Sequence, residues 1–245
     1  MKKILTILIC FSCFATLKAS HLAGGEIWYE YAGDSLHPNR YVINLRLYRD
    51  VSGAIFGSGG KTLCVSSSCF SNFNVYLNLV PVVDKVLPLD TLPGSVPGSI
   101  LTPDLTDCVD SNSPGLVFSE AYLYQKVVDL PGKCSNFMFS YAECCRNNSS
   151  TLHQAAGKYF YFEAYLNNTA SDNSSPRFVN PAAKSFCVGI PIKWSQTAIE
   201  PDGDSLYYAL ETPLDGRCGS PGSAIPYATN FSLSNPITTT SGTSL

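Results

Sequence analysis

The feature that most restricts the fold of this chain is an alternation of apolar and polar side chains, which recurs from about residue 26 to residue 166. It is clearest in the range 41–48, where tyrosine, isoleucine and two leucines take every second position, with asparagine and arginine among the residues between them. Side chains of a β-strand point alternately to opposite faces, so this spacing predicts a strand with one apolar and one mostly polar face. Helical periodicity is nearly absent. The sequence therefore predicts an all-β protein.

The same alternation, with many Tyr and Phe residues, predicts strands at 26–32, 41–48, 73–79, 117–128, 136–143 and 158–166. The ranges 51–60, rich in glycine, and 81–114, rich in proline and aspartate, predict connections. Further along, the ranges 185–188, 190–197, 206–212 and 227–233 predict at most four more strands.

The domain organisation follows from a change in composition at 167–176, where Asn, Ser, Asp, Thr and Pro dominate. Such a stretch is typical of a linker. We therefore expect two β-sandwich domains, at 21–166 and 177–245. Because a sandwich of the immunoglobulin type needs about seven strands, we expect the second domain to be incomplete at its C-terminal end.

Residues 1–20 have the layout of a signal peptide. Lys2 and Lys3 precede an apolar run at 4–17, and Ala19 and Ser20 supply small residues for cleavage. The run is shorter than the roughly 20 residues that span a bilayer, and no later segment is apolar enough to do so. The sequence predicts export, and no membrane span in this chain.

The charge balance argues against nucleic acid as a partner. Residues 1–20 hold three of the 16 basic residues and none of the 19 acidic ones, so the rest of the chain has 13 basic residues and a net charge of −6. Nucleic-acid binding depends on neutralising phosphates with Lys and Arg. We expect no nucleic-acid partner.

Of the ten cysteines, two lie in the signal segment and eight follow it. An even number of cysteines after a signal peptide predicts disulfides, and the absence of a C-x-x-C pair among these eight disfavours a zinc site. We expect all eight to form bridges within the chain: Cys64, Cys69, Cys108, Cys134, Cys144, Cys145, Cys187 and Cys218.

The expected pairing follows the expected domains. Cys187 and Cys218 are the only cysteines after residue 176, so we expect them to pair with each other. In the first domain we expect a local Cys64–Cys69 bridge. We expect Cys144 and Cys145 to form two separate bridges, one to Cys108 and the other to Cys134. A bond between the adjacent Cys144 and Cys145 closes an eight-membered ring, so we do not expect it.

Three carboxylates stand close together at Glu200, Asp202 and Asp204, within a Glu-Pro-Asp-Gly-Asp turn. Alternate acids in a tight turn can direct several oxygens to one point, which suits calcium and its six to eight oxygen ligands. The alternative is a hairpin turn whose acids face water. The roughly twelve-residue loop of an EF-hand is missing. Calcium is thus one interpretation of these three residues, and the sequence predicts no other cofactor.

The same stretch carries a resemblance. Asn173-Ser174-Ser175-Pro176, Phe178 and the acidic run from Glu200 to Leu206 resemble the opening of a cadherin-like or immunoglobulin-like repeat of bacterial surface proteins. Such repeats have aspartate where this chain has Glu200. The resemblance implies an immunoglobulin-like or cadherin-like second domain.

Three segments of the first domain carry a second resemblance: Ser20-His21-Leu22-Ala23-Gly24-Gly25-Glu26-Ile27-Trp28-Tyr29, Leu45-Arg46-Leu47-Tyr48-Arg49-Asp50 and Tyr141-Ala142-Glu143-Cys144-Cys145-Arg146-Asn147-Asn148. In these segments the domain resembles the large exported surface proteins of Bacteroidota that are associated with gliding motility and type IX secretion. Relatives have cysteine where this chain has Val51. The resemblance implies an extracellular β-rich module of a larger cell-surface protein, with further domains downstream.

Motifs of catalysis are scarce. The chain has three histidines, and neither a G-x-S-x-G elbow nor an H-E-x-x-H helix. The range 57–62 resembles the end of a phosphate-binding loop, but Ile55 stands where that loop needs glycine. We therefore predict a non-catalytic protein with a structural or adhesive role, acting on an extracellular glycan or protein surface. The alternative is a carbohydrate-binding module that uses exposed tyrosines, and a secreted hydrolase is a weaker alternative.

Overall fold

The computed structural model describes residues 22–50, 56, 58–80, 99–101, 119–179 and 196–237. The part of the chain so described consists of strands and their connections, with no helix, and confirms the all-β prediction. The expected signal segment 1–20, Cys108 and Cys187 lie outside it, as does the predicted strand 185–188.

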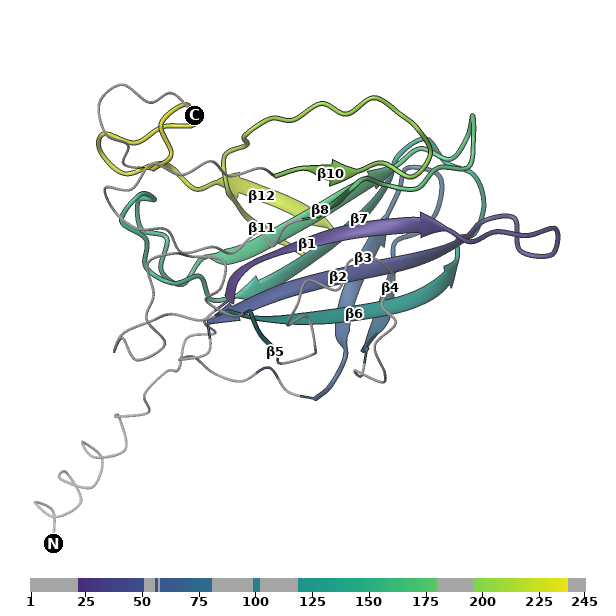
Figure 1. The fold of residues 1–245 in the computed structure, drawn as a ribbon, viewed down its shortest axis with the longest axis horizontal. Coiled ribbons are helices and arrows are strands. Elements are labelled where there is room, and N and C mark those ends of the chain that lie inside the picture. The colour runs from purple at the N-terminus through teal and green to yellow at the C-terminus, as the bar shows by residue number, and fades with distance from the viewer. Residues whose placement is uncertain are drawn as a thin grey trace, which may run out of the picture.

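The main feature is a large antiparallel sheet (Figure 1). Its strands follow the order β1-β2-β6-β4-β3-β7-β8, and the short β5 also pairs with β6. Their bounds are β1 Leu22–Tyr31, β2 Arg40–Asp50, β3 Lys61–Ser66, β4 Phe73–Leu79, β5 Ser99–Leu101, β6 Ser119–Asp129, β7 Phe137–Cys144 and β8 Tyr159–Leu166.

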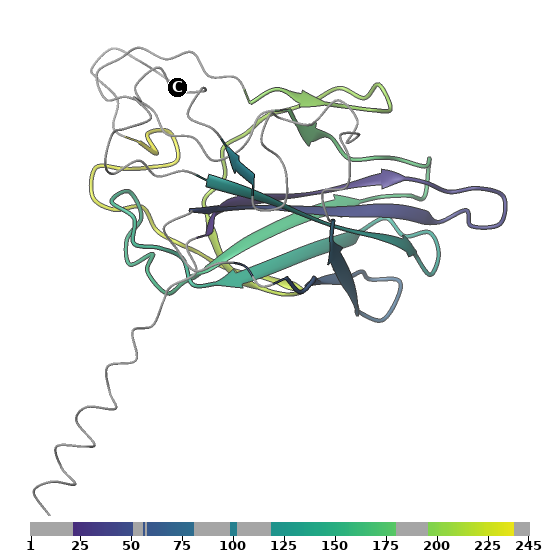
Figure 2. The same ribbon diagram turned by 60° about the horizontal axis from the view of Figure 1, so that its bottom comes forward.

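The sheet curves so that its first and last strands come together (Figure 2). The Tyr29 hydroxyl on β1 donates a 2.7 Å hydrogen bond to the carbonyl of Tyr165 on β8. The Tyr29 ring also lies 5.5 Å from the ring of Phe139 on β7. Side chains from both ends of the sheet therefore share one apolar core.

The alternation seen in the sequence defines this core. Tyr41, Ile43, Leu45 and Leu47 of β2 are fully buried in it. The opposite face of β2 differs from the expectation of a mostly polar, solvated surface, because Asn44 and Tyr48 are also buried. This part of the sheet is covered on both faces.

Strand predictions were accurate in the first part of the chain and poor after residue 176. The prediction for 73–79 coincides with β4, whereas β3 was missed. The predicted strands 206–212 and 227–233 are wrong, since neither range forms a strand. The strands found there are instead short: β9 Arg177–Phe178, β10 Ala198–Ile199, β11 Leu214–Arg217 and β12 Ser220–Ala224.

The predicted linker 167–176 lies along the free edge of β1. Ser174 and Ser175 are buried, and the Ser175 hydroxyl accepts a 2.9 Å hydrogen bond from the Tyr29 backbone N–H. The Ser175 N–H donates in return to the Tyr29 carbonyl. The Ser174 hydroxyl accepts from the Tyr31 N–H at 3.1 Å. This segment supplies the hydrogen-bond partners that an exposed edge strand would lack. The division into two domains stays a prediction.

The hairpin of β11 and β12 is bonded to the outer face of β3, β7 and β8. A disulfide joins Cys64 on β3 to Cys218 in the turn of the hairpin. Next to it, the Gly219 N–H donates to the Ser140 hydroxyl of β7 at 2.9 Å. Residues 154 positions apart in sequence are thereby linked.

Candidate functional site

The acidic turn is the first candidate site, and two of its three acids bind backbone N–H groups. An oxygen of Glu200 accepts a 2.7 Å hydrogen bond from the Asp204 N–H. An oxygen of Asp202 accepts a 2.5 Å hydrogen bond from the N–H of Ser174, in the segment along β1. The turn thus fastens that segment in place.

The arrangement of the turn gives no support for a metal site. Among the described residues, which include all three acids, no group of three or more His, Cys, Asp or Glu side chains is placed to hold a metal ion. Calcium binding by Glu200, Asp202 and Asp204 stays a prediction of the sequence. Thermal unfolding in millimolar calcium and in chelator tests it, and equal midpoints would contradict it.

We expect Asp202→Ala to lower the free energy of unfolding by about 1–2 kcal/mol, because the Ser174 N–H loses a charged acceptor. Asp204→Ala is the matched control: its side chain is exposed and it uses its backbone N–H in the turn. That change should cost less than about 0.5 kcal/mol. Urea unfolding measures both, and equal effects of the two changes would contradict the role of Asp202.

Beyond the turn, the backbone runs from Gly203 to Pro213 without turn, bend or strand pairing. Figure 1 shows it within the arch that joins β10 to β11. Tyr207 is 91% exposed, and Tyr208 and Leu210 are more than half exposed. The sequence predicted a strand at 206–212 because these residues have strand-forming side chains, but within the described ranges no strand pairs with them.

The exposed tyrosines lie on different elements. Tyr76 is on β4, Tyr165 is on β8, and Tyr207 and Tyr208 are neighbours in the segment after the acidic turn. The hydroxyls of Tyr76 and Tyr208 accept hydrogen bonds from the N–H groups of Gly60 and Ala198. An aromatic platform would need at least two rings on one surface, and only Tyr207 and Tyr208 are close in sequence.

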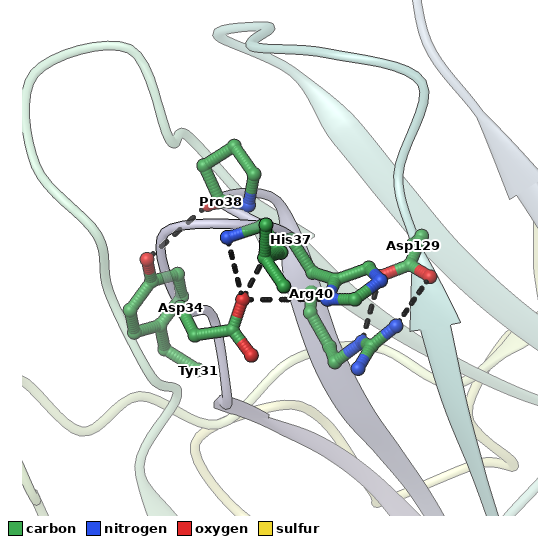
Figure 3. Close-up of polar contacts among 7 residues, drawn as sticks. Tyr31, Asp34, His37, Pro38, Arg40 and Asp129 are labelled. Atoms are coloured by element: carbon green, nitrogen blue, oxygen red, sulfur yellow. Dashed lines mark hydrogen bonds and ion pairs between the residues drawn. The ribbon is translucent and has the colours of Figure 1, made fainter.

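The loop between β1 and β2 is a second candidate surface (Figure 3). One oxygen of Asp34 accepts hydrogen bonds from the N–H groups of Leu36 and His37, both at 2.8 Å. These bonds hold the pKa of Asp34 below its usual range, the His37 N–H having the larger effect. Where the loop meets β2, the guanidinium of Arg40 forms a bidentate ion pair with the carboxylate of Asp129. The loop is well fixed and presents Leu36, which is 82% exposed. A single exposed apolar side chain is common on protein surfaces, so it does not define a site.

The disulfides differ from the predicted pairs. Cys64 pairs with Cys218, so the predictions Cys64–Cys69 and Cys187–Cys218 are wrong. Cys69 pairs with Cys134, with 6.0 Å between their Cα atoms. The sulfurs of Cys144 and Cys145 lie at disulfide distance from each other, against our expectation. The predictions for Cys64 and Cys218 failed because they assumed that bridges stay within each predicted domain, whereas the β11–β12 hairpin lies on β3. The predicted bridge from Cys134 to Cys144 or Cys145 is wrong as well, because Cys134 pairs with Cys69.

Asp215 on β11 joins the hairpin to β8 and was not singled out in the sequence. One of its oxygens accepts a 2.9 Å hydrogen bond from the Tyr159 N–H, and Lys158 and Arg217 each lie 3.1 Å from the carboxylate. The pKa of Asp215 is lowered to about 2. The hydrogen bond from the Tyr159 N–H lowers it most, and Lys158 and Arg217 lower it further. The carboxylate is thus strongly favoured in its charged form.

A pH dependence of stability follows for Asp215. The pKa is lowered from 3.8 in the unfolded chain to about 2 in the folded one, so the contribution of Asp215 is present above about pH 4 and is lost as the pH falls toward 2. We expect roughly 1–2 kcal/mol, allowing for partial screening by solvent. Urea unfolding at pH 2.5 and pH 5 measures it. In Asp215→Asn the difference between the two pH values should shrink by that amount; an unchanged difference would contradict the prediction.

A buried polar cluster on β1 and β2 also escaped the sequence reasoning. Arg46 and the Tyr48 hydroxyl both donate to one oxygen of Glu26, at 3.3 Å and 2.9 Å. The Arg46 guanidinium lies 4.9 Å from the Trp28 ring. Burial raises the pKa of Glu26, and Arg46 opposes that rise. Glu26 and Arg46 lie opposite each other in the register of β1 and β2, and this register could not be read from the sequence.

The sequence matches no protein-family profile, and neither the curated proteins nor the solved structures contain a significant match to it. In the described part of the chain, no helix has the length and apolar character needed to cross a membrane.

Proposed function

We propose that this chain is a non-catalytic extracellular module of a bacterial cell-surface protein, in which β-sandwich surfaces have a structural or adhesive role. The observation that carries the proposal is the pair of bridges Cys64–Cys218 and Cys69–Cys134, which link elements far apart in sequence. Disulfides of this kind form and persist in oxidising compartments outside the cytoplasm. The signal-like segment 1–20 supports the same location.

The resemblance to exported Bacteroidota proteins suggests the setting. On that basis the chain belongs to a larger surface protein connected with gliding motility and type IX secretion, and residues 177–245 begin an immunoglobulin-like or cadherin-like domain. Its partner is a glycan or a protein outside the cell.

Localisation and thiol state test the proposal together. The tagged protein, expressed in a Gram-negative host, should lose about twenty N-terminal residues and leave the cytoplasm. Labelling of free thiols in the denatured, unreduced protein should find almost none. Uncleaved protein in the cytoplasm, or two or more free thiols per chain, would overturn the proposal.

A carbohydrate-binding role is the second candidate, favoured by the high exposure of Tyr207 and Tyr208. Stacking of sugars on aromatic rings would make glycan binding depend on these side chains. A glycan array with the native protein and with Tyr207→Ala tests it, and Tyr165→Ala on β8 is the control because Tyr165 is also exposed but lies elsewhere. Binding that both variants retain would exclude Tyr207 as the platform.

A further inference from the structure

The segment 205–212 combines strand-forming residues with a backbone that pairs with no other described strand. In the described part of the chain, no backbone hydrogen bond joins this segment to another strand. In sequence, the segment lies between the turn at 201–202 and strand β11. It is fixed near both ends: the Asp204 N–H donates to Glu200, and the Pro213 carbonyl accepts from Ile225 at 2.7 Å. In the middle, the Tyr208 hydroxyl accepts from the Ala198 N–H. A segment that is held at these points, without a turn or bend, leaves its backbone groups available to another strand.

The side chains of this segment favour contact with an apolar partner. Tyr207 is almost completely exposed, and Tyr208 and Leu210 are more than half exposed. Three large apolar side chains within four residues differ from the single exposed residues common on protein surfaces. Main-chain hydrogen bonds and alternate apolar side chains are the two requirements for adding a strand from a partner.

Charge restricts which strand can be added. Asp202 and Asp204 precede the segment and Glu211 lies near its end, and no Lys, Arg or His occurs from residue 196 to residue 216. An antiparallel second copy of the segment would bring Asp204 of one chain close to Glu211 of the other, and like charges opposite each other are unfavourable in a sheet. A partner strand with basic residues at its ends avoids this repulsion and gains attraction.

We propose that residues 205–212 form a strand-addition site for an extended segment of another protein that is apolar at alternate positions and basic at its ends. This inference names the surface and the partner class of the binding role, and so rests on the proposed function. Main-chain bonds to residues 205–212 would supply affinity, and the acids around the segment would select basic ends.

The test is selection from a phage-displayed library of random twelve-residue peptides on the oxidised native protein. Enriched peptides are then synthesised, and their affinities are measured for the native protein and three variants. Ala209→Pro removes a backbone N–H from an exposed position without other described contacts. Leu210→Ser removes an exposed apolar side chain and leaves the charge unchanged. Leu36→Ser is the matched control, because it removes a leucine side chain that is even more exposed than Leu210 from the β1–β2 loop.

We expect enriched peptides to show alternating apolar residues with Lys or Arg at their ends. Their affinity should fall about tenfold or more in Ala209→Pro and in Leu210→Ser, stay unchanged in Leu36→Ser, and decrease with salt. Hydrogen exchange of the backbone amides of residues 205–212 should slow when the peptide binds the native protein. Outside this segment, the free variants should exchange at the same rates as the free native protein, which would show that they are folded.

Four results would overturn the inference. They are enrichment no better than on the bare support, enriched peptides without alternation or basic ends, equal binding by Ala209→Pro, and self-association of the protein through this segment. Each leaves export and thiol oxidation unaffected, so failure of the strand-addition site is distinguishable from failure of the proposed function.

Discussion

Replacement of Cys64 and Cys218 by serine is expected to lower the free energy of unfolding by about 3–5 kcal/mol. The bridge between them spans 154 positions, so its loss gives the unfolded chain much additional conformational freedom. In the folded protein, the β11–β12 hairpin would remain on the sheet through Gly219–Ser140 and Asp215–Tyr159 hydrogen bonds. For a chain of this size the change corresponds to a decrease of roughly 10 °C in the melting temperature.

The second long-range bridge supplies a matched comparison. Cys69 and Cys134 are 65 positions apart, so their removal releases a shorter loop. The loop-length dependence alone makes the loss of Cys64–Cys218 roughly 0.8 kcal/mol more costly. Denaturant unfolding of both double variants measures the order. Peptide mapping of the unreduced protein should first recover the linked pairs 64–218 and 69–134; recovery of Cys64–Cys69 or Cys187–Cys218 would contradict the structure.

The first part of the fold was predictable because its signal is local. A strand that is buried on one face repeats every two residues, and the apolar positions of β2 and β4 carry that period without interruption. The six-residue β3 has the apolar positions Leu63 and Val65 at the same spacing, but it is short and follows a glycine-rich stretch. Period and length together decide which strands a sequence reveals.

The site could be predicted only in part, because its contacts join distant segments. The acidic residues of the turn were recognisable, but the acceptor role of Asp202 depends on Ser174, which lies 28 positions earlier. Likewise, the strand predicted at 206–212 is wrong although its residues have strand-forming side chains, because no described strand lies alongside it in the folded chain. Disulfide partners follow the same rule, since Cys218 reaches Cys64 only once the hairpin lies on the sheet.

The core aromatic residues give the other prediction of large effect, and Phe139 is the clearest case. It is fully buried on β7, its ring contacts Tyr29 of β1, and its backbone lies opposite Val65 of β3 and Ala164 of β8. One side chain therefore contributes to packing between strands from both ends of the sheet. Removing it leaves a cavity that several fixed strands cannot fill.

Phe139→Ala is expected to lower the free energy of unfolding by about 3–5 kcal/mol, which combines the lost burial with the cost of the cavity. Phe139→Leu retains most of the volume and should cost roughly 1–2 kcal/mol. The control is Tyr165→Ala on the adjacent β8, which removes an aromatic ring that is 60% exposed and should change stability by less than about 1 kcal/mol. Denaturant unfolding measures all three. If Phe139→Ala and Tyr165→Ala lower the free energy of unfolding equally, the core does not lie between β1 and β7. A large decrease for Phe139→Ala alone places the core there, because only the removal of a buried ring leaves a cavity.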